Sequence, residues 1–175
     1  AVEGSYERAK KKEILFGTVD SFLVWNLTRH KKHLTDVTNA SRTMLFNIRD
    51  LKWDDELLLK FDIPYEILPE VVDSGGLHGE FIYQDRKIPI TAIMGDQASL
   101  FGQCAFTKGE IKNTYGTGCF ALLNLGEECV LSKNSLLTTI AWKYKDSVAY
   151  ALEGSIFIGG QVVSWLFDNM QIIHN

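Results

Sequence analysis

The chain has 175 residues, of which 46% are hydrophobic, 23% are charged and 11% are aromatic. This composition is typical of a globular protein, and the length allows one domain or two small ones to bury a core. The net charge of −4 argues against a surface dedicated to nucleic acid. The basic run at residues 8–12 is followed at once by Glu13 and is interpreted as a solvated helix face.

The three cysteines, Cys104, Cys119 and Cys129, include no CxxC pair. Their odd number indicates neither a disulfide framework nor a zinc site and favours reduced thiols in the cytosol. The sequence shows no leader and no apolar stretch of membrane-spanning length, so a soluble cytoplasmic protein is expected. The chain begins without methionine and stops inside an apolar helical pattern at residues 165–175, which predicts an internal piece of a longer protein.

Two helices are predicted in the first third of the chain. Thr18 or Asp20 can cap a helix whose apolar residues follow at 22–28. Acidic residues crowd the first turn of a second helix at 53–61, where they suit the positive end of the helix dipole. Pro64 then closes that helix, because the residue before a proline is pushed out of the helical region.

Two further segments are predicted to lack regular structure. Residues 34–43 are rich in small hydroxyl and amide side chains and are interpreted as a loop. Residues 71–77 contain a glycine pair and are interpreted as a turn or linker. Strands are predicted at 81–83 and 87–94, around the polar connection 84–86.

The second half of the chain changes to a strand pattern. The predicted elements are a short helix at 98–105, strands at 110–115 and 119–125, a hairpin of 136–142 and 147–152, and a helix opened by residues 153–160 that runs to the end. A helical half followed by a meander and a helix predicts a domain change near residues 106–109.

The apolar run at residues 88–94 ends in Gly95, Asp96 and Gln97. An acid at the carboxyl end of a strand lies where open α/β sheets place their chemistry. A carboxylate there can take the proton of a phosphoryl acceptor hydroxyl, although Asp96 could instead only cap the following helix. Gln97 can bind a polyol hydroxyl or sit exposed in the first helical turn.

Residues 116–118 form a Gly-Thr-Gly turn between two predicted strands. The flanked Thr117 offers backbone N–H groups and a hydroxyl to an anion such as phosphate, but an ordinary hairpin turn is the alternative. Gly159 and Gly160 lie at a second strand-to-helix junction, where they can meet a nucleotide or permit close helix packing. Together with Asp96, the turn predicts a phosphotransferase.

Several longer strings in the chain resemble the FGGY carbohydrate kinases, most closely the members that phosphorylate glycerol. They are residues 16–20, 35–48, 53–58, 95–97, 113–120, 132–142 and 150–154. The resemblance covers nearly the whole chain. It implies an α/β protein of the actin-like ATPase (ribonuclease H-like) fold that contains parts of two domains. Residues 1–106 would be the later part of the first, substrate-side domain, and residues 107–175 the start of the second, nucleotide-side domain.

The resemblance further implies ATP-dependent phosphorylation of glycerol to sn-glycerol 3-phosphate, with Mg²⁺ accompanying ATP and a homo-oligomer as the intact form. Asp96 would be the general base, and Gln97 would bind a glycerol hydroxyl. Phe120, which the pattern alone favours as a core residue, would pack against the glycerol carbons.

On the nucleotide side, the resemblance places Thr117, with Gly116 and Gly118 beside it, against the phosphates of ATP. Gly160 would lie against the nucleotide from the second domain. The metal ligands stay open. No nucleic acid and no membrane are expected as partners.

Two departures from the family pattern affect these expectations. Similar proteins usually carry one more residue between Gln97 and Leu100, and a missing residue at a helix start rotates the rest of the helix by about 100 degrees unless the entry loop absorbs it. The placement of Gln97 is affected more than that of Asp96. The family's amino-terminal phosphate loop and its remaining substrate and adenine contacts do not occur in the sequence, so the 175-residue piece alone is expected to have no kinase activity.

Two alternative functions remain open. The protein could be a kinase for a ketopentose or another polyol. It could also be a non-catalytic nucleotide-binding regulator on the same scaffold, which would have no need of a base for a sugar hydroxyl.

Overall fold

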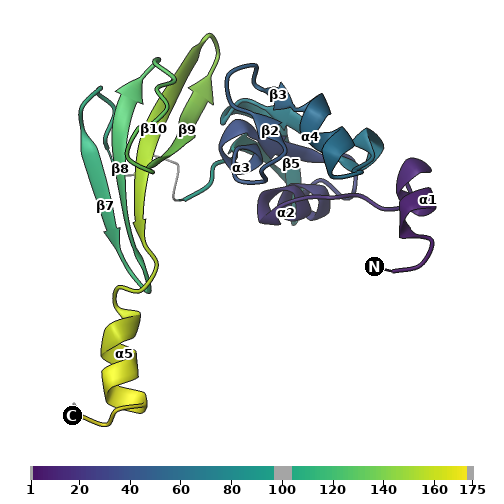
Figure 1. The fold of residues 1–175 in the computed structure, drawn as a ribbon. Helices are drawn as coiled ribbons and strands as arrows, with labels where there is room; N and C mark the ends of the chain where they lie inside the picture. The colour runs from purple at the N-terminus through teal and green to yellow at the C-terminus, as the bar shows by residue number, and fades with distance from the viewer. Residues whose placement is uncertain (1, 97–103, 173–175) are drawn as a thin grey trace.

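The computed structural model describes residues 2–96 and 104–172. They form two parts: short helices with two-stranded sheets in the first, and a four-stranded antiparallel sheet followed by a helix in the second (Figure 1). Most of the helix predicted at 98–105 lies outside the described residues.

The first part is built from many short elements. In chain order they are α1 (Ser5–Lys10), α2 (Val19–Leu27), β1 (Leu34–Asp36), α3 (Val37–Ala40), β2 (Phe46–Asn47), β3 (Lys52–Trp53), α4 (Asp55–Lys60), the 3₁₀ turn η1 (Tyr65–Ile67), β4 (Glu70–Val72), β5 (Gly75–Tyr83) and β6 (Arg86–Ala92). Strand β1 pairs with β4 in parallel, whereas β2 with β3 and β5 with β6 form antiparallel pairs.

Helices α2 and α4 confirm the two predicted helices. Asp54 caps α4, and its carboxylate accepts the N–H groups of Glu56 and Leu57, both at 3.1 Å. Thr18 occupies the N-cap position of α2, but its side chain makes no capping bond, because its hydroxyl donates to the carboxylate of Asp20. Side-chain capping by Thr18 is therefore not what begins this helix.

The two segments predicted to be irregular contain regular structure. Residues 34–43 supply β1 and the single helical turn α3, and residues 71–77 supply the end of β4 and the start of β5. The loop prediction was wrong because small polar residues usually bond to their own backbone in turns. Here the polar side chains of Thr35, Asp36 and Thr38 are almost completely buried and bond within the fold.

The second part confirms the predicted strands and corrects the last helix. Its elements are β7 (Ile111–Tyr115), β8 (Cys119–Gly126), β9 (Leu137–Tyr144), β10 (Ser147–Ile156) and α5 (Gln161–Asp168), with sheet order β7-β8-β10-β9. Residues 153–156 were predicted to open the final helix. They instead extend β10, because they pair with residues 119–122 of β8.

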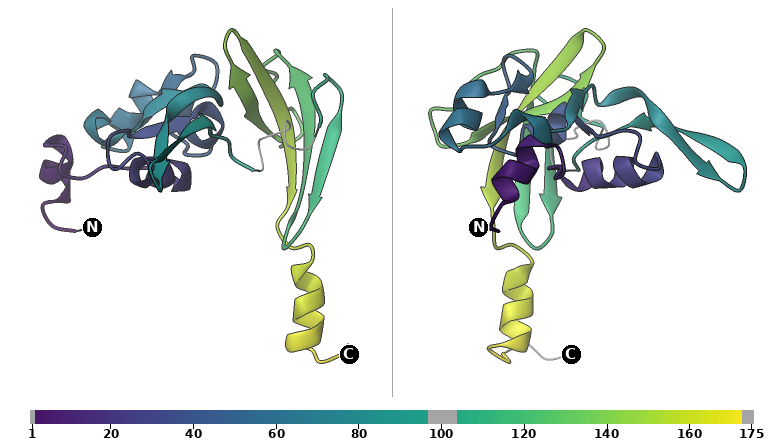
Figure 2. Two further views of the ribbon diagram at one scale, coloured as in Figure 1. Left: turned by 180° about the vertical axis from the view of Figure 1, so that it is seen from behind. Right: turned by 90° about the vertical axis from the view of Figure 1, so that its right-hand side faces the viewer.

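The two parts share a hydrophobic core. Strand β9, at the edge of the sheet, contacts α3 and β5 of the first part (Figures 1 and 2). Ile140 and Tyr150 of the sheet join a cluster made otherwise by residues of the first part, including Val37, Trp53 and Leu58. The sheet and the first part are thus packed as one body along this edge.

Helix α5 projects beyond the end of the sheet (Figure 2). None of its residues is buried, and large apolar side chains such as Val163 and Trp165 are exposed. In the two ranges that the structure describes, no helix is long and apolar enough to cross a membrane.

His78 of β5 is a buried titratable group, 7% exposed, whose Nε2 has no hydrogen-bond partner within the described residues. Burial lowers its pKa below the usual 6.5, against the opposing effects of a bond to the Ser74 backbone and of the charges of Asp36 and Asp73. The folded state therefore binds fewer protons than the unfolded chain just below pH 6.5. Stability is lost as the pH falls from 6.5 toward the lowered pKa.

We expect the free energy of unfolding to fall more steeply in the wild type than in His78→Gln between about pH 7.5 and about pH 5, because glutamine gains no charge in this range. Urea denaturation of both proteins at several pH values measures the difference. Parallel pH dependences would contradict the expected cost of protonating His78.

Candidate active site

Asp96 lies just beyond the end of β6, where its side chain is exposed. Asp96 thus follows the carboxyl end of a strand, as predicted, but β6 pairs only with β5 in a two-stranded antiparallel sheet within the described residues, and not in a larger α/β sheet. Two hydrogen bonds from backbone N–H groups hold the segment just before Asp96 in place. The N–H of Gly95 donates to Thr38 Oγ1 at 2.8 Å, and the N–H of Ile93 donates to the carbonyl of Ser74 at 2.9 Å.

A buried lysine on β7 accompanies Asp96. Lys112 is only 6% exposed, and its Nζ donates to Thr114 Oγ1 at 2.9 Å. Burial lowers the pKa of its ammonium group, whereas the negative charges of Asp96 and Glu153 raise it. The charges of these two carboxylates therefore favour the protonated form of Lys112, against the effect of its burial. The sequence analysis did not identify Lys112 as a site residue. The signal that could have indicated it is a charged residue within a predicted strand.

Phe120 of β8 lies on the sheet face that carries this lysine. It pairs in register with Thr114 of β7 and with Ser155 of β10, and directly opposed side chains in a sheet lie on one face. Its ring is partly buried and packs against the cluster that contains Leu122. The core interpretation of Phe120 is confirmed, and part of the ring remains open to solvent.

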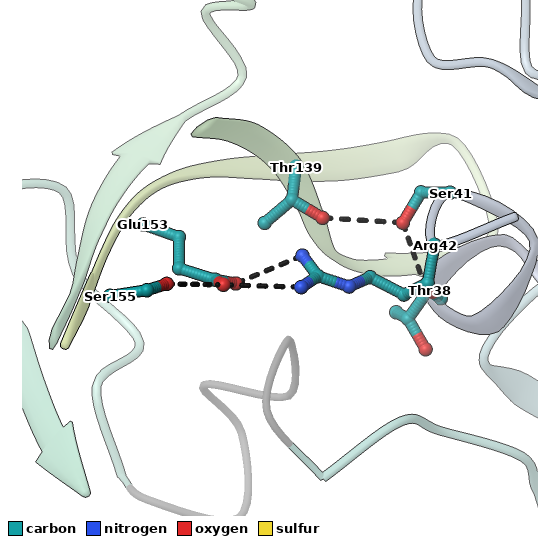
Figure 3. Close-up of polar contacts among 6 residues, drawn as sticks. All are labelled: Thr38, Ser41, Arg42, Thr139, Glu153 and Ser155. Atoms are coloured by element: carbon teal, nitrogen blue, oxygen red, sulfur yellow. Dashed lines mark hydrogen bonds and ion pairs between the residues drawn. The ribbon is translucent and has the colours of Figure 1, made fainter. Parts of the chain in front are cut away.

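An ion pair joins the two parts of the molecule next to this face (Figure 3). Arg42, which follows α3, donates from both terminal nitrogens to Glu153 of β10, with distances of 2.9 and 3.1 Å. The Glu153 side chain is 2% exposed, and Ser155 Oγ donates to the same carboxylate at 3.0 Å. A bidentate pair of this kind fixes orientation as well as distance. The two residues are 111 positions apart, so no local pattern could have paired them.

A hydroxyl contact runs beside the ion pair. Ser41 Oγ and Thr139 Oγ1 lie 3.2 Å apart, which links the residue after α3 to β9 (Figure 3). Ser41 Oγ also donates to the carbonyl of Thr38 at 2.7 Å. The end of α3 is therefore attached to both of the strands, β9 and β10, that meet the first part.

The Gly-Thr-Gly turn meets the segment before α5 through the backbone. The N–H of Gly159 donates to the carbonyl of Thr117 at 2.7 Å, and that of Gly160 donates to the carbonyl of Gly116 at 2.8 Å. These two amides are therefore engaged inside the protein. The structure does not offer them to an anion in the way the sequence suggested. Gly116 and Thr117 are exposed, and Gly118 is buried.

The approach is so close that three glycines leave no room for a side chain. A Cβ on Gly118 would lie 2.8 Å from the carbonyl oxygen of Ile156, and one on Gly160 would lie 2.8 Å from that of Gly116. A Cβ on Gly159 would lie 2.5 Å from Cys119 Sγ. Close packing, one of the two interpretations of the Gly159–Gly160 pair, is therefore confirmed for the junction before α5.

The structure thus gathers the candidate residues into two groups. Lys112 and Phe120 lie on one face of the four-stranded sheet, and the charge of Asp96, which follows β6 of the first part, acts on Lys112. The glycine turn meets Gly160 at the start of α5. Gln97 lies outside the described residues. Across residues 2–96 and 104–172, no group of three or more His, Cys, Asp or Glu side chains is arranged to hold a metal ion.

Comparison with known proteins gives a consistent result for the sequence. Residues 1–102 match the N-terminal domain of the FGGY family of carbohydrate kinases. Proteins named glycerol kinase from Brachyspira hyodysenteriae and Paraburkholderia xenovorans are 53% and 58% identical to the chain over 99% of its length. The chain covers 35% and 36% of these relatives, so it spans about a third of their length.

Solved structures agree. The crystal structure of Plasmodium falciparum glycerol kinase with ADP superposes with a TM-score of 0.86 and 38% identity, over 99% of this chain and 36% of that one. A ligand-bound xylulose kinase from Lactobacillus acidophilus superposes with a TM-score of 0.68 and 24% identity, over 86% of this chain and 31% of that one. The second likeness shows the fold alone. The expected actin-like ATPase fold is confirmed.

We expect Gly118→Ala to lower the free energy of unfolding by about 1–3 kcal/mol, because the added methyl group would press against backbone atoms that cannot rotate away. Gly116→Ala is the matched control, since its Cβ would meet only the carbonyl of Gly118 at 3.7 Å. Urea denaturation of both variants provides the comparison. Equal destabilisation by the two substitutions would show that the close approach is not what selects glycine at position 118.

Proposed function

Because the chain belongs to the FGGY family of carbohydrate kinases, we propose that the whole protein transfers the γ-phosphoryl group of ATP to glycerol and forms sn-glycerol 3-phosphate. The relatives named glycerol kinase, at 53% and 58% identity, support this substrate. The activity is assigned to the whole protein, since the chain covers only 35% and 36% of those relatives.

The observation that carries the proposal is the setting of Asp96. Its carboxylate is exposed at the exit of β6, on a backbone held by hydrogen bonds, and its charge acts on the buried Lys112. Lys112 lies on the same β7–β8 hairpin that carries Thr117 in its turn. One hairpin thus carries both the lysine on which the Asp96 charge acts and the turn of the proposed phosphate site.

In the proposed reaction Asp96 is the general base. As a terminal hydroxyl oxygen of glycerol bonds to the γ-phosphorus and the bond to ADP breaks, the carboxylate accepts the hydroxyl proton. Lys112 attracts this carboxylate and helps to hold it in place. The open part of the Phe120 ring is proposed to pack against the glycerol carbons, and Gln97 to bind a glycerol hydroxyl.

On the nucleotide side, Thr117 is proposed to contact the phosphates with its exposed hydroxyl, next to Gly116 and Gly118. Helix α5 begins at Gln161, whose N–H donates to the carbonyl of Thr117 at 3.3 Å. The positive end of the helix dipole therefore lies beside the turn, where it favours an anion. Gly160 is proposed to lie against the nucleotide.

Mg²⁺ is part of the proposal as the companion of ATP. The described residues offer no cluster of carboxylates for it. In kinase sites, however, magnesium is held mainly by phosphate oxygens and water, with one or two protein carboxylates. Protein ligands for the ion are therefore not assigned to this chain.

We also propose that the substrate-side domain ends near residue 106 and that the nucleotide-side domain begins at 107. The match of residues 1–102 to an N-terminal family domain supports this boundary. The exposed apolar side chains of α5 are in keeping with further second-domain structure that would cover them. The three unpaired cysteines are in keeping with a cytoplasmic location. A homo-oligomer remains an expectation for the intact protein.

We expect Asp96→Asn in the whole protein to lower the turnover number about 100- to 10,000-fold, because a positioned general base contributes a factor of this size. Nucleotide affinity should stay close to that of the wild type. The measurement is ADP formation that depends on the acceptor, run with glycerol, other polyols and ketoses. Near-normal turnover by Asp96→Asn would remove Asp96 from the role of base.

The contrasting variant is Thr117→Ala, which should act through the nucleotide by raising its KM or lowering turnover. An effect confined to the KM for glycerol would count against the phosphate site. If the protein phosphorylates only a ketose, the fold assignment stands and the substrate is a ketose and not glycerol. If the protein binds ATP but transfers no phosphoryl group to any alcohol, the alternative of a non-catalytic nucleotide-binding regulator is favoured.

A further inference from the structure

We propose that Thr38 is a positioning residue for Asp96: its buried hydroxyl fixes the backbone at Gly95 and so sets where the neighbouring carboxylate meets the acceptor hydroxyl. This inference rests on the proposed function, because it assigns Thr38 to the same phosphoryl-transfer site. Thr38 itself is 0% exposed and acts through Gly95.

The hydroxyl of Thr38 is bonded on both sides. It accepts the N–H of Gly95 at 2.8 Å and donates to the carboxylate of Asp36, with 2.8 Å to either oxygen. A hydroxyl group has one proton to donate and lone pairs to accept with, so both bonds can exist together. Asp36 is 0% exposed as well. The acceptor that holds Gly95 is therefore itself held from within the core.

A second tether to the same segment starts from the same carboxylate. Ser74 Oγ donates to Asp36 at 2.7 Å, and the carbonyl of Ser74 accepts the N–H of Ile93 at 2.9 Å. Ile93 and Gly95 are alternate residues of the chain that leaves β6, and Met94 between them packs against a core cluster. The segment before Asp96 is thus attached at every second residue to groups that Asp36 orders.

Gly95 also lies against the side chains of α3. A Cβ built on it would be 3.4 Å from Asn39 Oδ1 and 3.6 Å from Thr38 Oγ1. Asn39 is held in turn, because its Nδ2 donates to Asp36 at 2.8 Å. Since a displacement of about 1 Å at a reacting group can cost about 100-fold in rate, release of Gly95 from this support should be visible in turnover.

The experiment compares Thr38→Val with Thr35→Val in the whole protein. Both threonines are almost fully buried, at 0% and 1% exposure, and both donate to an aspartate; Thr35 bonds to Asp20 at 2.8 Å and not to Gly95. We expect Thr38→Val to lower turnover with glycerol about 100-fold with nucleotide affinity preserved. Thr35→Val should stay close to the wild type. Equal effects of the two variants would overturn the proposal.

Two further variants separate positioning from general damage. Thr38→Ser keeps the hydroxyl and should restore most of the turnover; a serine variant as slow as the valine variant would overturn the proposal. In the Asp96→Asn background, Thr38→Val should cause little additional loss, because residues that act as a unit are not additive. A full additional loss would mean that Thr38 acts independently of Asp96. If the valine variant does not fold, Thr38→Ala takes its place in the same comparisons.

The same assay distinguishes this proposal from the proposed function. Loss of turnover in Asp96→Asn with normal turnover in Thr38→Val would reject the positioning role alone. A wild-type protein that phosphorylates no glycerol would reject the proposed function, and the role of Thr38 with it.

Discussion

The burial of Asp36 is the constraint on which the rest of the structure depends. Its carboxylate has no exposed surface, so hydrogen bonds must replace water around it. Burial raises its pKa, and the bonds from Ser74, Asn39 and Thr38 oppose this effect without cancelling it. The donors come from the start of α3 and from the link before β5. Ser74 continues to β9, because its Oγ accepts the N–H of Lys143 at 3.1 Å. One buried charge thus orders three separate segments.

The contact between the two parts fixes the orientation of the four-stranded sheet relative to the first part. The Arg42–Glu153 pair and the shared core around Ile140 attach the end of α3 to the sheet. Only Glu153 is buried, whereas the Arg42 side chain remains 36% exposed, so loss of Arg42 would leave a buried carboxylate without its cation. We therefore interpret the Arg42–Glu153 pair as a contact that fixes the position of β10 relative to α3. It sets the sheet, and with it the β7–β8 hairpin, relative to the segment that carries Asp96.

Local sequence patterns predicted much of the fold, and they failed where distant contacts decide. The hairpins were predictable because alternation and turn residues act within a few positions, as in β9 and β10. Residues 34–43 were predicted to be a loop because their polar groups are typical of turns, whereas Asp36 and Thr38 serve a buried network. The end of β10 was predicted to be helical because its pairing with β8 cannot be seen from its own composition.

The sequence by itself determined the resemblance to a kinase family, the carboxylate at position 96 and the glycine turn around Thr117, because each is a short string with its own chemical character. Only the tertiary structure decided what surrounds them. It brought Thr38 to Gly95 across 57 positions and Arg42 to Glu153 across 111. It also buried Lys112 where the charge of Asp96 acts on it. The physical reason is that hydrogen bonds and charge pairs depend on distance in space, and only folding sets that distance for residues far apart in the chain.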